Sequence, residues 1–471
     1  MHRLELSPDR FSTTPLHRQL YHRVRDAIAG GRLKPGDRVP SIRSLASELN
    51  LSRGTVELAY QTLASEGYLL SRGAAGTVVS PQIIPARVAR ATASRPGADV
   101  AIAEPTPTGP QPFQLGLPAL DAVPTRLWQR LMTRRLRAMD VAALDYPDRQ
   151  GKPELRNALA AYLGVSRGIA CDPDQIIITA GYCEALTLVC RTLLQTGDRG
   201  WFEEPGYFQA RATLQAAGIA LTPVEVDAQG LNVERARRQA GYARVAVVTP
   251  THQSPTGVSL SLPRRLALLE WARENKAWII EDDYDSEYRY HGRPLPPLKS
   301  LDHDGRVLYA GTLSKVLFPG IRLAYLVVPR AEITRFQDVL QRYGHGCPEL
   351  SQAALADFIE QGHFARHLKR MRALYAQRRE YLQKALAARF GDRLRIDSQA
   401  GGMHLLVRLD DEDSDVELAE RAQRQGLNIQ ALSTWCAGPT AQSGLLLGFT
   451  NIVSANEAGR LVDSLKQAFD G

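Results

Sequence analysis

The 471-residue sequence predicts an α/β protein in two parts: a small helical unit that ends in a β-hairpin, residues 1–80, and a large unit with a mostly parallel sheet, residues 113–471. Three observations lead to this prediction. Three amphipathic helical patterns and two short β runs fill the first part. A proline-rich stretch without apolar periodicity, residues 81–112, predicts a linker. Short β-branched runs then alternate with amphipathic segments, as they do in βαβ units.

Composition places the chain among ordinary globular proteins. Hydrophobic residues make up 44% and charged residues 23% of the chain, which leaves enough apolar side chains for a sizeable core. The first twenty residues lack the apolar region of a secretory signal, and no run approaches the roughly 18 apolar residues of a membrane span. The five cysteines form no CxxC pair. We therefore expect reduced thiols in a cytoplasmic protein without a membrane partner.

Positive charge is concentrated at the N-terminus. Residues 1–80 hold eleven basic and seven acidic side chains, a net charge of +4, which is half of the +8 of the whole chain. A locally basic segment favours a polyanion as partner, although charge alone is weak evidence.

The first 80 residues read as three helices and a hairpin. Thr14–Pro15 predicts the first helix start, with proline at the first helical position, and Gly30–Gly31 predicts its end. Ser41 and Ser52 are predicted N-caps of the second and third helices, and Asn50 closes the second. The inward-facing residues are Leu16, Leu20, Val24 and Ile28, then Leu45 and Leu49, then Val56, Ala59 and Leu63. The run "GYLLSRGAAGTVVS" predicts two strands around a glycine-rich turn.

This order of elements describes a winged helix-turn-helix. The N-terminal end of the third helix, where a recognition helix meets DNA, carries Arg53 and Thr55. Arg43 opens the preceding helix, and Arg72 lies at the hairpin tip. Each arginine alone is explained as well by solvation at the surface. Because basic residues occupy all three expected contact points, we predict binding to double-stranded DNA.

Residues 15–69, "PLHRQLYHRVRDAIAGGRLKPGDRVPSIRSLASELNLSRGTVELAYQTLASEGYL", resemble the winged-helix domain of GntR-type regulators. The motifs "LKPGDRVPSIRSLA", "LSRGTV" and "AYQTLASEGYL" carry the resemblance in the expected order. It implies DNA contacts by Ser41, Arg43, Ser52, Arg53 and Thr55, and by a wing from Arg72 to Thr77 that includes Gly73 and Gly76.

Past Phe113, strand-like runs alternate with helical segments such as "SLPRRLALLEWARENK". The runs are "QIIITA", "ARVAVVTP", "AWIIEDDY", "RVLYAG" and "RLAYLVVP". Such alternation predicts a sheet covered on both faces, with ligands bound beyond the carboxyl ends of its strands.

Polar residues gather at those predicted strand ends. They are Gly181, Tyr182 and Cys183 after "QIIITA", Tyr207 after "GWFEEPG", Asp282 and Tyr284 in "AWIIEDDY", and Thr312, Ser314 and Lys315 after "RVLYAG", followed by Arg322. Each has an ordinary explanation alone, as a turn, a cap, a core aromatic or a solvated lysine. The set includes a helix start suited to phosphate, an aromatic ring, an acid, a phenol and an amine.

Pyridoxal phosphate requires these groups together. Lys315 supplies an amine for a Schiff base, Asp282 a carboxylate for the pyridine nitrogen, and Tyr284 a phenol for the ring hydroxyl. The backbone at Gly181 and the guanidinium of Arg322 suit the phosphate. The sequence therefore predicts pyridoxal 5'-phosphate as cofactor, with Lys315 as its covalent attachment site.

From Asp145 to about Val328 the sequence also resembles fold-type I aminotransferases, in "YPDRQGKPELRNALAAYL", "TAGYCEALTLV", "EEPGY", "SPTG", "EDDYDSE" and "GTLSKVLFPGIR". A winged helix joined to such a domain resembles the MocR subfamily of GntR regulators, over nearly the whole chain. This implies the same cofactor ligands, a small C-terminal α+β subdomain and a head-to-tail homodimer. Within "TPTHQSPTG", Ser254 replaces the asparagine that aminotransferases place against the ring hydroxyl.

One expected residue is absent. Aminotransferases bind the substrate α-carboxylate with an arginine just before a strand that "SGLLLGF" resembles. No arginine lies between Arg424 and Arg460, and Gln442 stands near the expected place, while Gln209 follows Tyr207 by two residues. This argues against an amino-acid transaminase.

We interpret the chain as a transcriptional regulator that binds promoter DNA and senses pyridoxal phosphate, or an amine that reacts with its lysine adduct. Genes of vitamin B6 metabolism are a plausible target. One alternative is an active aminotransferase tethered to DNA. Another is a fold that binds no cofactor and serves for dimerisation.

Overall fold

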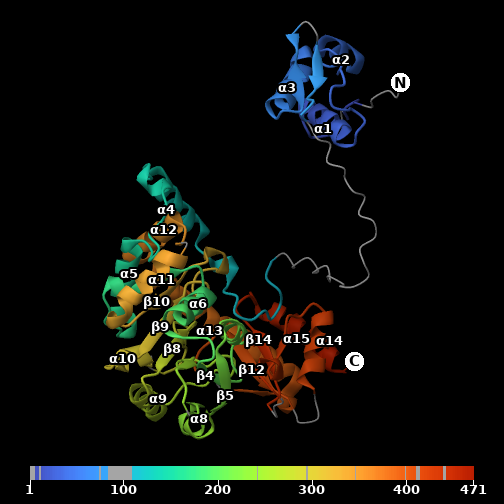
Figure 1. The fold of residues 1–471 in the computed structure, drawn as a ribbon. Coiled ribbons are helices and arrows are strands. Elements are labelled where there is room, and N and C mark those ends of the chain that lie inside the picture. The colour runs from blue at the N-terminus through green and yellow to red at the C-terminus, as the bar shows by residue number, and fades with distance from the viewer. Residues whose placement is uncertain are drawn as a thin grey trace. The chain divides into compact units, whose positions relative to one another are not determined.

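The structure is a computed structural model that describes residues 6–9, 12–73, 76–82, 109–240, 242–292, 295–344, 346–397, 399–409, 414–438 and 442–470. The chain divides into two compact units at residues 106 and 107 (Figure 1). Most of the expected linker, residues 81–112, lies outside the described residues.

The N-terminal unit contains three helices and a two-stranded hairpin. They are α1 (Leu16–Ala29), α2 (Ile42–Leu49), α3 (Arg53–Ser65), β1 (Leu69–Ser71) and β2 (Thr77–Val79). The two strands pair antiparallel, with Leu69 opposite Val79. All three helices bury apolar side chains in one core that includes Leu20, Val24, Val56 and Leu63. The predicted winged helix-turn-helix is confirmed.

The helices in this unit begin and end at the predicted capping residues, except at the start of α1. The side chains of Ser41 and Ser52 accept hydrogen bonds from the backbone N–H groups of Ser44 and Thr55, as N-caps do. Asn50 ends α2 in the left-handed conformation. Pro15 was expected inside α1, but it lies just before the helix with an extended ψ of 139°.

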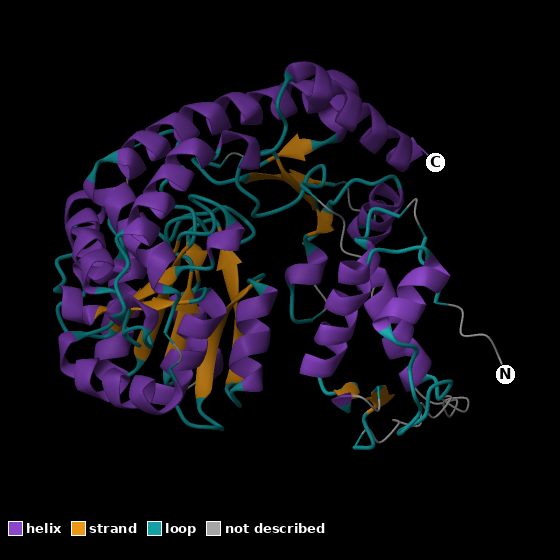
Figure 2. Cartoon of the chain, turned by 90° about the horizontal axis from the view of Figure 1, so that it is seen from above, coloured by secondary structure: helices purple, strands orange, loops and turns teal. Residues whose placement is uncertain are grey.

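The large unit is built on an eight-stranded sheet with helices on both faces (Figure 2). Its strands are β3 (Ile176–Thr179), β4 (Arg199–Glu204), β5 (Ala220–Asp227), β6 (Gly230–Leu231), β7 (Val245–Val248), β8 (Trp278–Asp283), β9 (Val307–Thr312) and β10 (Ala324–Val327). The strand order is β3-β10-β9-β8-β7-β4-β5-β6. Strand β10 runs antiparallel to both of its neighbours and β6 runs antiparallel to β5, while β4, β5, β7, β8 and β9 are parallel.

Helices pack on both faces of this sheet. Those of the large unit are α4 (Thr125–Arg137), α5 (Pro153–Arg167), α6 (Tyr182–Leu193), α7 (Phe208–Ala216), α8 (Val233–Ala240), α9 (Leu262–Asn275), α10 (Leu298–Leu301), α11 (Ile333–Tyr343), α12 (Glu349–Glu360) and α13 (His363–Phe390). One apolar cluster joins the sheet to α6, α7 and α11, and a second joins it to α8, α9 and α10. Because both faces are covered, β7, β8, β9 and β10 are buried along nearly their whole length, and the acidic residues of β8 lie at its carboxyl end.

The C-terminal residues form the expected small α+β subdomain. It contains β11 (Arg395–Ile396), β12 (His404–Arg408), β13 (Gln430–Ala431), β14 (Leu445–Gly448), α14 (Asp415–Arg424) and α15 (Ala455–Asp470). Its antiparallel sheet has the order β11-β12-β14-β13. Helix α13 packs against α15 and connects the subdomain to the large sheet. Among the described residues, no helix combines the length and the hydrophobicity needed to cross a membrane.

Candidate functional site

The predicted cofactor residues lie at one edge of the large sheet. Strands β4, β7, β8 and β9 are mutually parallel, and β3 shares their direction because β10 runs antiparallel to both β3 and β9. The carboxyl ends of these five strands therefore meet at the same edge, where a ligand binds in such sheets. Every predicted cofactor residue except Arg322 lies at or just beyond one of these ends, and Arg322 lies just before β10, whose first residue pairs with the last residue of β9 at the same edge.

Lys315 follows β9 and turns inward. Its Nζ donates a hydrogen bond to the carbonyl of Gly116, at 2.8 Å. Burial lowers the pKa of this amine, while the carboxylates of Asp285 and Asp282 act in the opposite direction. A lowered pKa leaves more of the amine unprotonated, which is the nucleophilic form that a Schiff base requires.

The start of α6 lies close to the guanidinium of Arg322. Gly181 precedes the helix with a φ of 135°, and no side chain caps the helix start. A Cβ on Gly181 would lie 3.3 Å from a guanidinium nitrogen of Arg322, so backbone and guanidinium face each other closely. Cys183 is the second residue of the helix. Free N–H groups, the positive end of the helix dipole and a guanidinium together suit a phosphate.

The two adjacent aspartates at the end of β8 have different surroundings. Alternation along the strand sends their side chains to opposite faces of the sheet. Asp283 forms an ion pair with Arg167, at 2.5 Å, and accepts a hydrogen bond from the hydroxyl of Tyr309, at 2.6 Å. These contacts give Asp283 a structural role. Asp282 faces the phenol of Tyr182, and burial raises the pKa of its carboxyl. Asp282 is therefore the carboxylate that remains for a ligand.

Tyr207 lies after β4 and meets the C-terminal subdomain. Its ring centroid lies 6.0 Å from that of Trp435, and its hydroxyl donates to Gln209 Oε1 at 2.5 Å. Near it, Leu406, Leu432, Trp435 and Leu446 form a buried apolar cluster. Gln442 precedes β14, and the described part of that segment contains no arginine, as expected.

Tyr284 has partners that the sequence did not indicate. Its hydroxyl lies 2.9 Å from Nδ1 of His252, a residue of the loop after β7. Thr312 and Ser314 lie between β9 and Lys315, where the Thr312 hydroxyl accepts from the Ser314 N–H at 3.2 Å. His252, Gly116 and Trp435 were all missed, because their contacts join segments that are far apart in the chain.

The residues present fit pyridoxal phosphate. A partly buried amine, a buried carboxylate, a phenol and a helix start with no side-chain cap lie around one strand edge. The hydroxyl of Tyr182 is buried against the carboxyl of Asp282. A buried polar pair of this kind suits a polar group of a ligand, such as a ring nitrogen.

The predicted DNA contacts all belong to one unit. Arg43 is the second residue of α2, Arg53 is the first residue of α3, and both are exposed. The hydroxyls of Ser41 and Ser52 cap helices, so their first role is structural. Gly73, Gly76 and Thr77 lie at the hairpin, where a Cβ on Gly76 would meet the guanidinium of Arg38 at 2.8 Å.

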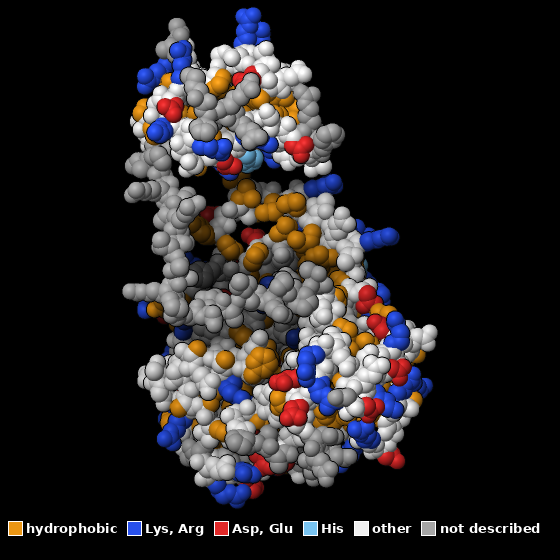
Figure 3. Space-filling model, turned by 90° about the vertical axis from the view of Figure 1, so that its right-hand side faces the viewer, with side chains coloured by type: hydrophobic (Ala, Val, Ile, Leu, Met, Phe, Trp, Pro, Cys, Tyr) orange, Lys and Arg blue, Asp and Glu red, His pale blue; other side chains and the backbone are white. Residues whose placement is uncertain are grey.

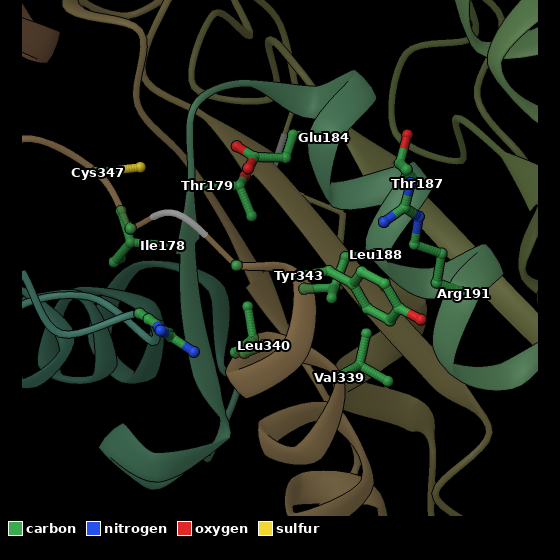
Figure 4. Close-up of a pocket in the computed structure, with 13 residues that line it drawn as sticks. Ile178, Thr179, Glu184, Thr187, Leu188, Arg191, Val339, Leu340, Tyr343 and Cys347 are labelled. Atoms are coloured by element: carbon green, nitrogen blue, oxygen red, sulfur yellow. The ribbon is translucent and has the colours of Figure 1, made fainter.

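A separate pocket of about 200 Å³ lies between α6 and α11 (Figure 4). Tyr343 and Arg191 face each other across it, with the guanidinium 5.0 Å from the ring centroid. None of the predicted cofactor residues lines this pocket. It is therefore distinct from the site around Lys315.

Comparison with known proteins finds a matching family for each of the two units. Residues 16–79 match the family model of bacterial regulatory proteins of the gntR family, and residues 119–441 match aminotransferase class I and II. In structure, the chain is similar to the kynurenine aminotransferase of Pyrococcus horikoshii, with a TM-score of 0.70 and 27% identity. That similarity covers 77% of this chain and 91% of the other. Fold and site thus define a winged-helix protein with an aminotransferase-like domain.

Relatives of full length share this organisation. The chain is 39% identical to the probable rhizopine catabolism regulatory protein MocR of Rhizobium meliloti, over 98% of this chain and 95% of that protein. It is 35% identical to the pyridoxine biosynthesis regulator PdxR of Corynebacterium glutamicum, over 93% of this chain and 92% of the relative. The chain belongs to the MocR subfamily of GntR-type transcriptional regulators.

Proposed function

We propose that this regulator binds promoter DNA through its winged helix and responds to pyridoxal phosphate held around Lys315. The observation that carries the proposal is the buried amine of Lys315, at the same sheet edge as Asp282, Tyr284 and the helix start at Gly181. Occupancy of this site would change DNA affinity only if the chain has two conformations that differ in DNA affinity and the ligand binds one of them better than the other.

The chain's own residues would hold the cofactor in distinct ways. Pyridoxal phosphate, when bound, supplies an aldehyde that condenses with amines. Lys315 would attach it, Asp282 would pair with its ring nitrogen, and Tyr284 would bind its ring hydroxyl. Gly181 and Arg322 would hold the phosphate, and Tyr207 would flank the ring together with Trp435.

A homodimer is part of the proposal. The segment after α4 exposes several large apolar side chains, with Val141 85%, Leu144 75% and Tyr146 93% exposed. Hydrophobic side chains gather on the upper part of the larger unit, at the height of α4 in Figure 1 (Figure 3). Exposed apolar patches of this kind support a protein interface, and a second copy of the chain suits a regulator that binds paired half-sites.

The effector and the target genes follow from chemistry and from relatives. The described residues just before β14 include no arginine that could pair with an α-carboxylate, which supports pyridoxal phosphate itself, or an amine other than an ordinary amino acid, as signal. The name of the Corynebacterium relative refers to pyridoxine biosynthesis. We therefore propose vitamin B6 metabolism genes as a target.

Fluorescence anisotropy on DNA upstream of the chain's own gene tests the proposal. Protein stripped of cofactor and protein reloaded with pyridoxal phosphate are titrated beside Lys315→Ala. We expect the affinities of the first two to differ, and the difference to vanish in the variant. Equal affinities in all forms would contradict sensing of pyridoxal phosphate, and absence of specific binding across the neighbouring genes would contradict the regulator.

The second candidate is an aminotransferase tethered to DNA. The aminotransferase class I and II match over residues 119–441 favours it. Steady transfer of an amino group from a common amino acid, lost in Lys315→Ala, would establish this activity.

A further inference from the structure

His252 is not among the predicted cofactor residues, yet it contacts one of them. It lies in the loop that follows β7, and its Nδ1 is 2.9 Å from the hydroxyl oxygen of Tyr284. The same nitrogen is 3.0 Å from Oδ2 of Asp285. Both partners lie just beyond β8. The side chains of His252 and Asp285 are 6% and 1% exposed, so solvent does not compete for these contacts.

The carboxylate decides where the imidazole proton lies. A neutral imidazole holds one proton, on either Nδ1 or Nε2. The Asp285 carboxylate oxygen that lies 3.0 Å from Nδ1 favours the tautomer with the proton on this nitrogen, because the positive end of an N–H group is attracted by a nearby carboxylate. With the proton on Nδ1, the ring would donate to the hydroxyl oxygen of Tyr284, which lies 2.9 Å away. In that arrangement the Tyr284 oxygen accepts the bond, and its own proton can go to another acceptor; the side chain of Ser254 also interacts with this hydroxyl.

The imidazole cannot turn away from this position. A Cβ on Gly402 would lie 2.2 Å from Cε1 of His252, so the backbone of the C-terminal subdomain lies directly against the ring. Gly402 is itself held, because its N–H donates to the carbonyl of Tyr288 at 2.9 Å. The ring of His404 is 5.8 Å away, and burial lowers its pKa to about 4, so it adds no charge near neutral pH.

A small polar cavity lies beside the ring. Its volume is about 10 Å³, which is about the space of one water molecule. Five side-chain atoms of its lining residues are buried without a hydrogen-bond partner: His252 Nε2, Asp285 Oδ2, Thr251 Oγ1, Ser286 Oγ and Arg289 Nε. Arg289 is the cation that faces this cavity.

We propose that His252, oriented by Asp285, is a positioning residue that directs the Tyr284 hydroxyl proton into the cofactor site. The inference rests on the proposed binding of pyridoxal phosphate. A hydroxyl has one proton. If the Tyr284 oxygen accepts a hydrogen bond from His252, its own O–H group would be free to donate a hydrogen bond to the ring oxygen of the cofactor. With the cofactor bound, that bond from Tyr284 would stabilise negative charge on the ring oxygen, so the form of the cofactor attached to Lys315 would lose its proton at a lower pH.

The visible absorption of the bound cofactor, titrated with pH, measures this effect. We expect His252→Leu to raise the midpoint by about one pH unit, in the same direction as Tyr284→Phe. His252→Asn retains an N–H donor near the Nδ1 position and should restore the native midpoint. In a Tyr284→Phe background, His252→Leu should add no further shift, because the two side chains act through one bond.

A packing role for His252 would give a different pattern. An unchanged midpoint in His252→Leu, or an equal shift in the Tyr284→Phe background, overturns the inference. His404→Leu is the matched control, since His404 is buried nearby but bonds to the Pro255 carbonyl at 2.8 Å, and it should leave the midpoint unchanged. If His252→Leu fails to fold, His252→Phe carries the same test. A native protein that never acquires the visible band overturns the proposed function and this inference together.

Discussion

Lys315 and Gly116 meet across 199 residues of chain: the lysine amine donates to the glycine carbonyl at 2.8 Å. Gly116 has a φ of +65°, and a Cβ there would lie 2.6 Å from the lysine Nζ. Only glycine adopts this backbone without strain and leaves room for the amine. The segment that contains Gly116 is anchored by Thr450 and Asn451, whose side chains donate to the carbonyl of Leu117.

Gly116→Ala should therefore block cofactor attachment. The added methyl group displaces the amine, so we expect the visible band to form at least about tenfold more slowly after pyridoxal phosphate is added, a barrier increase of at least about 1.4 kcal/mol. Gly168→Ala is the matched control, because Gly168 has the same φ of +65° but open space around it. Both variants should lose about 1–2 kcal/mol of stability. Equal rates of band formation in both would contradict the role of Gly116.

Arg53→Ala should weaken DNA binding. Arg53 is exposed at the first position of α3, where a recognition helix meets DNA. Loss of one such contact costs about 1–3 kcal/mol, so anisotropy should show about a tenfold to hundredfold weaker affinity. Arg25→Ala is the control, since Arg25 on α1 pairs with Asp26 at 3.1 Å. A similar loss in both variants would indicate a general charge effect instead of recognition by α3.

Val141→Asp combined with Leu144→Asp should separate the dimer. Both side chains are largely exposed in one chain, and burial of each in an interface would contribute about 1.5–3 kcal/mol. We expect the dimer dissociation constant, measured by sedimentation, to rise at least about hundredfold. Val165→Asp is the control, because Val165 on α5 is 93% exposed but lies outside this segment. An unchanged dissociation constant would place the interface elsewhere.

The sequence alone was sufficient to predict those features of the fold and the site that depend on one local pattern of residues. The β-branched runs became β3, β7, β8, β9 and β10, and most of the predicted cofactor residues lie at or after the carboxyl ends of β3, β8 and β9. The insertion of β10 between β3 and β9 was not predictable, because pairing between distant segments depends on packing of the whole sheet. The contact of His252 with Tyr284 was missed for the same reason: it joins two loops 32 residues apart.

The direction in which a side chain points could also not be predicted from the sequence. Tyr182 was predicted for its backbone at a phosphate site, but its phenol faces Asp282. Asp282 and Asp283 are chemically equivalent in the sequence, and only the ion pair of Asp283 with Arg167 distinguishes them. A pattern of residue types predicts a site's chemistry, whereas tertiary packing decides which of two neighbouring groups performs it.

The buried carboxyl of Glu203 makes the stability of the folded large unit depend on pH. Burial raises the pKa of its carboxyl from 4.5 to about 7, although it accepts hydrogen bonds from Thr249 and Gln253. The folded chain thus binds this proton more tightly than the unfolded chain does. The stability it contributes is complete below the unfolded pKa and is lost as pH rises through the folded pKa.

Glu203→Gln should remove this dependence. Between about pH 4.5 and about pH 7, the free energy of unfolding of the variant should rise by up to about 3 kcal/mol relative to that of the native chain. All five tryptophans lie in residues 113–471, so their fluorescence during urea unfolding reports on the large unit alone. Glu281, whose pKa burial also raises to about 7, is present in both proteins and cancels in the comparison. A difference that stays constant with pH would show that Glu203 ionises normally in the folded chain.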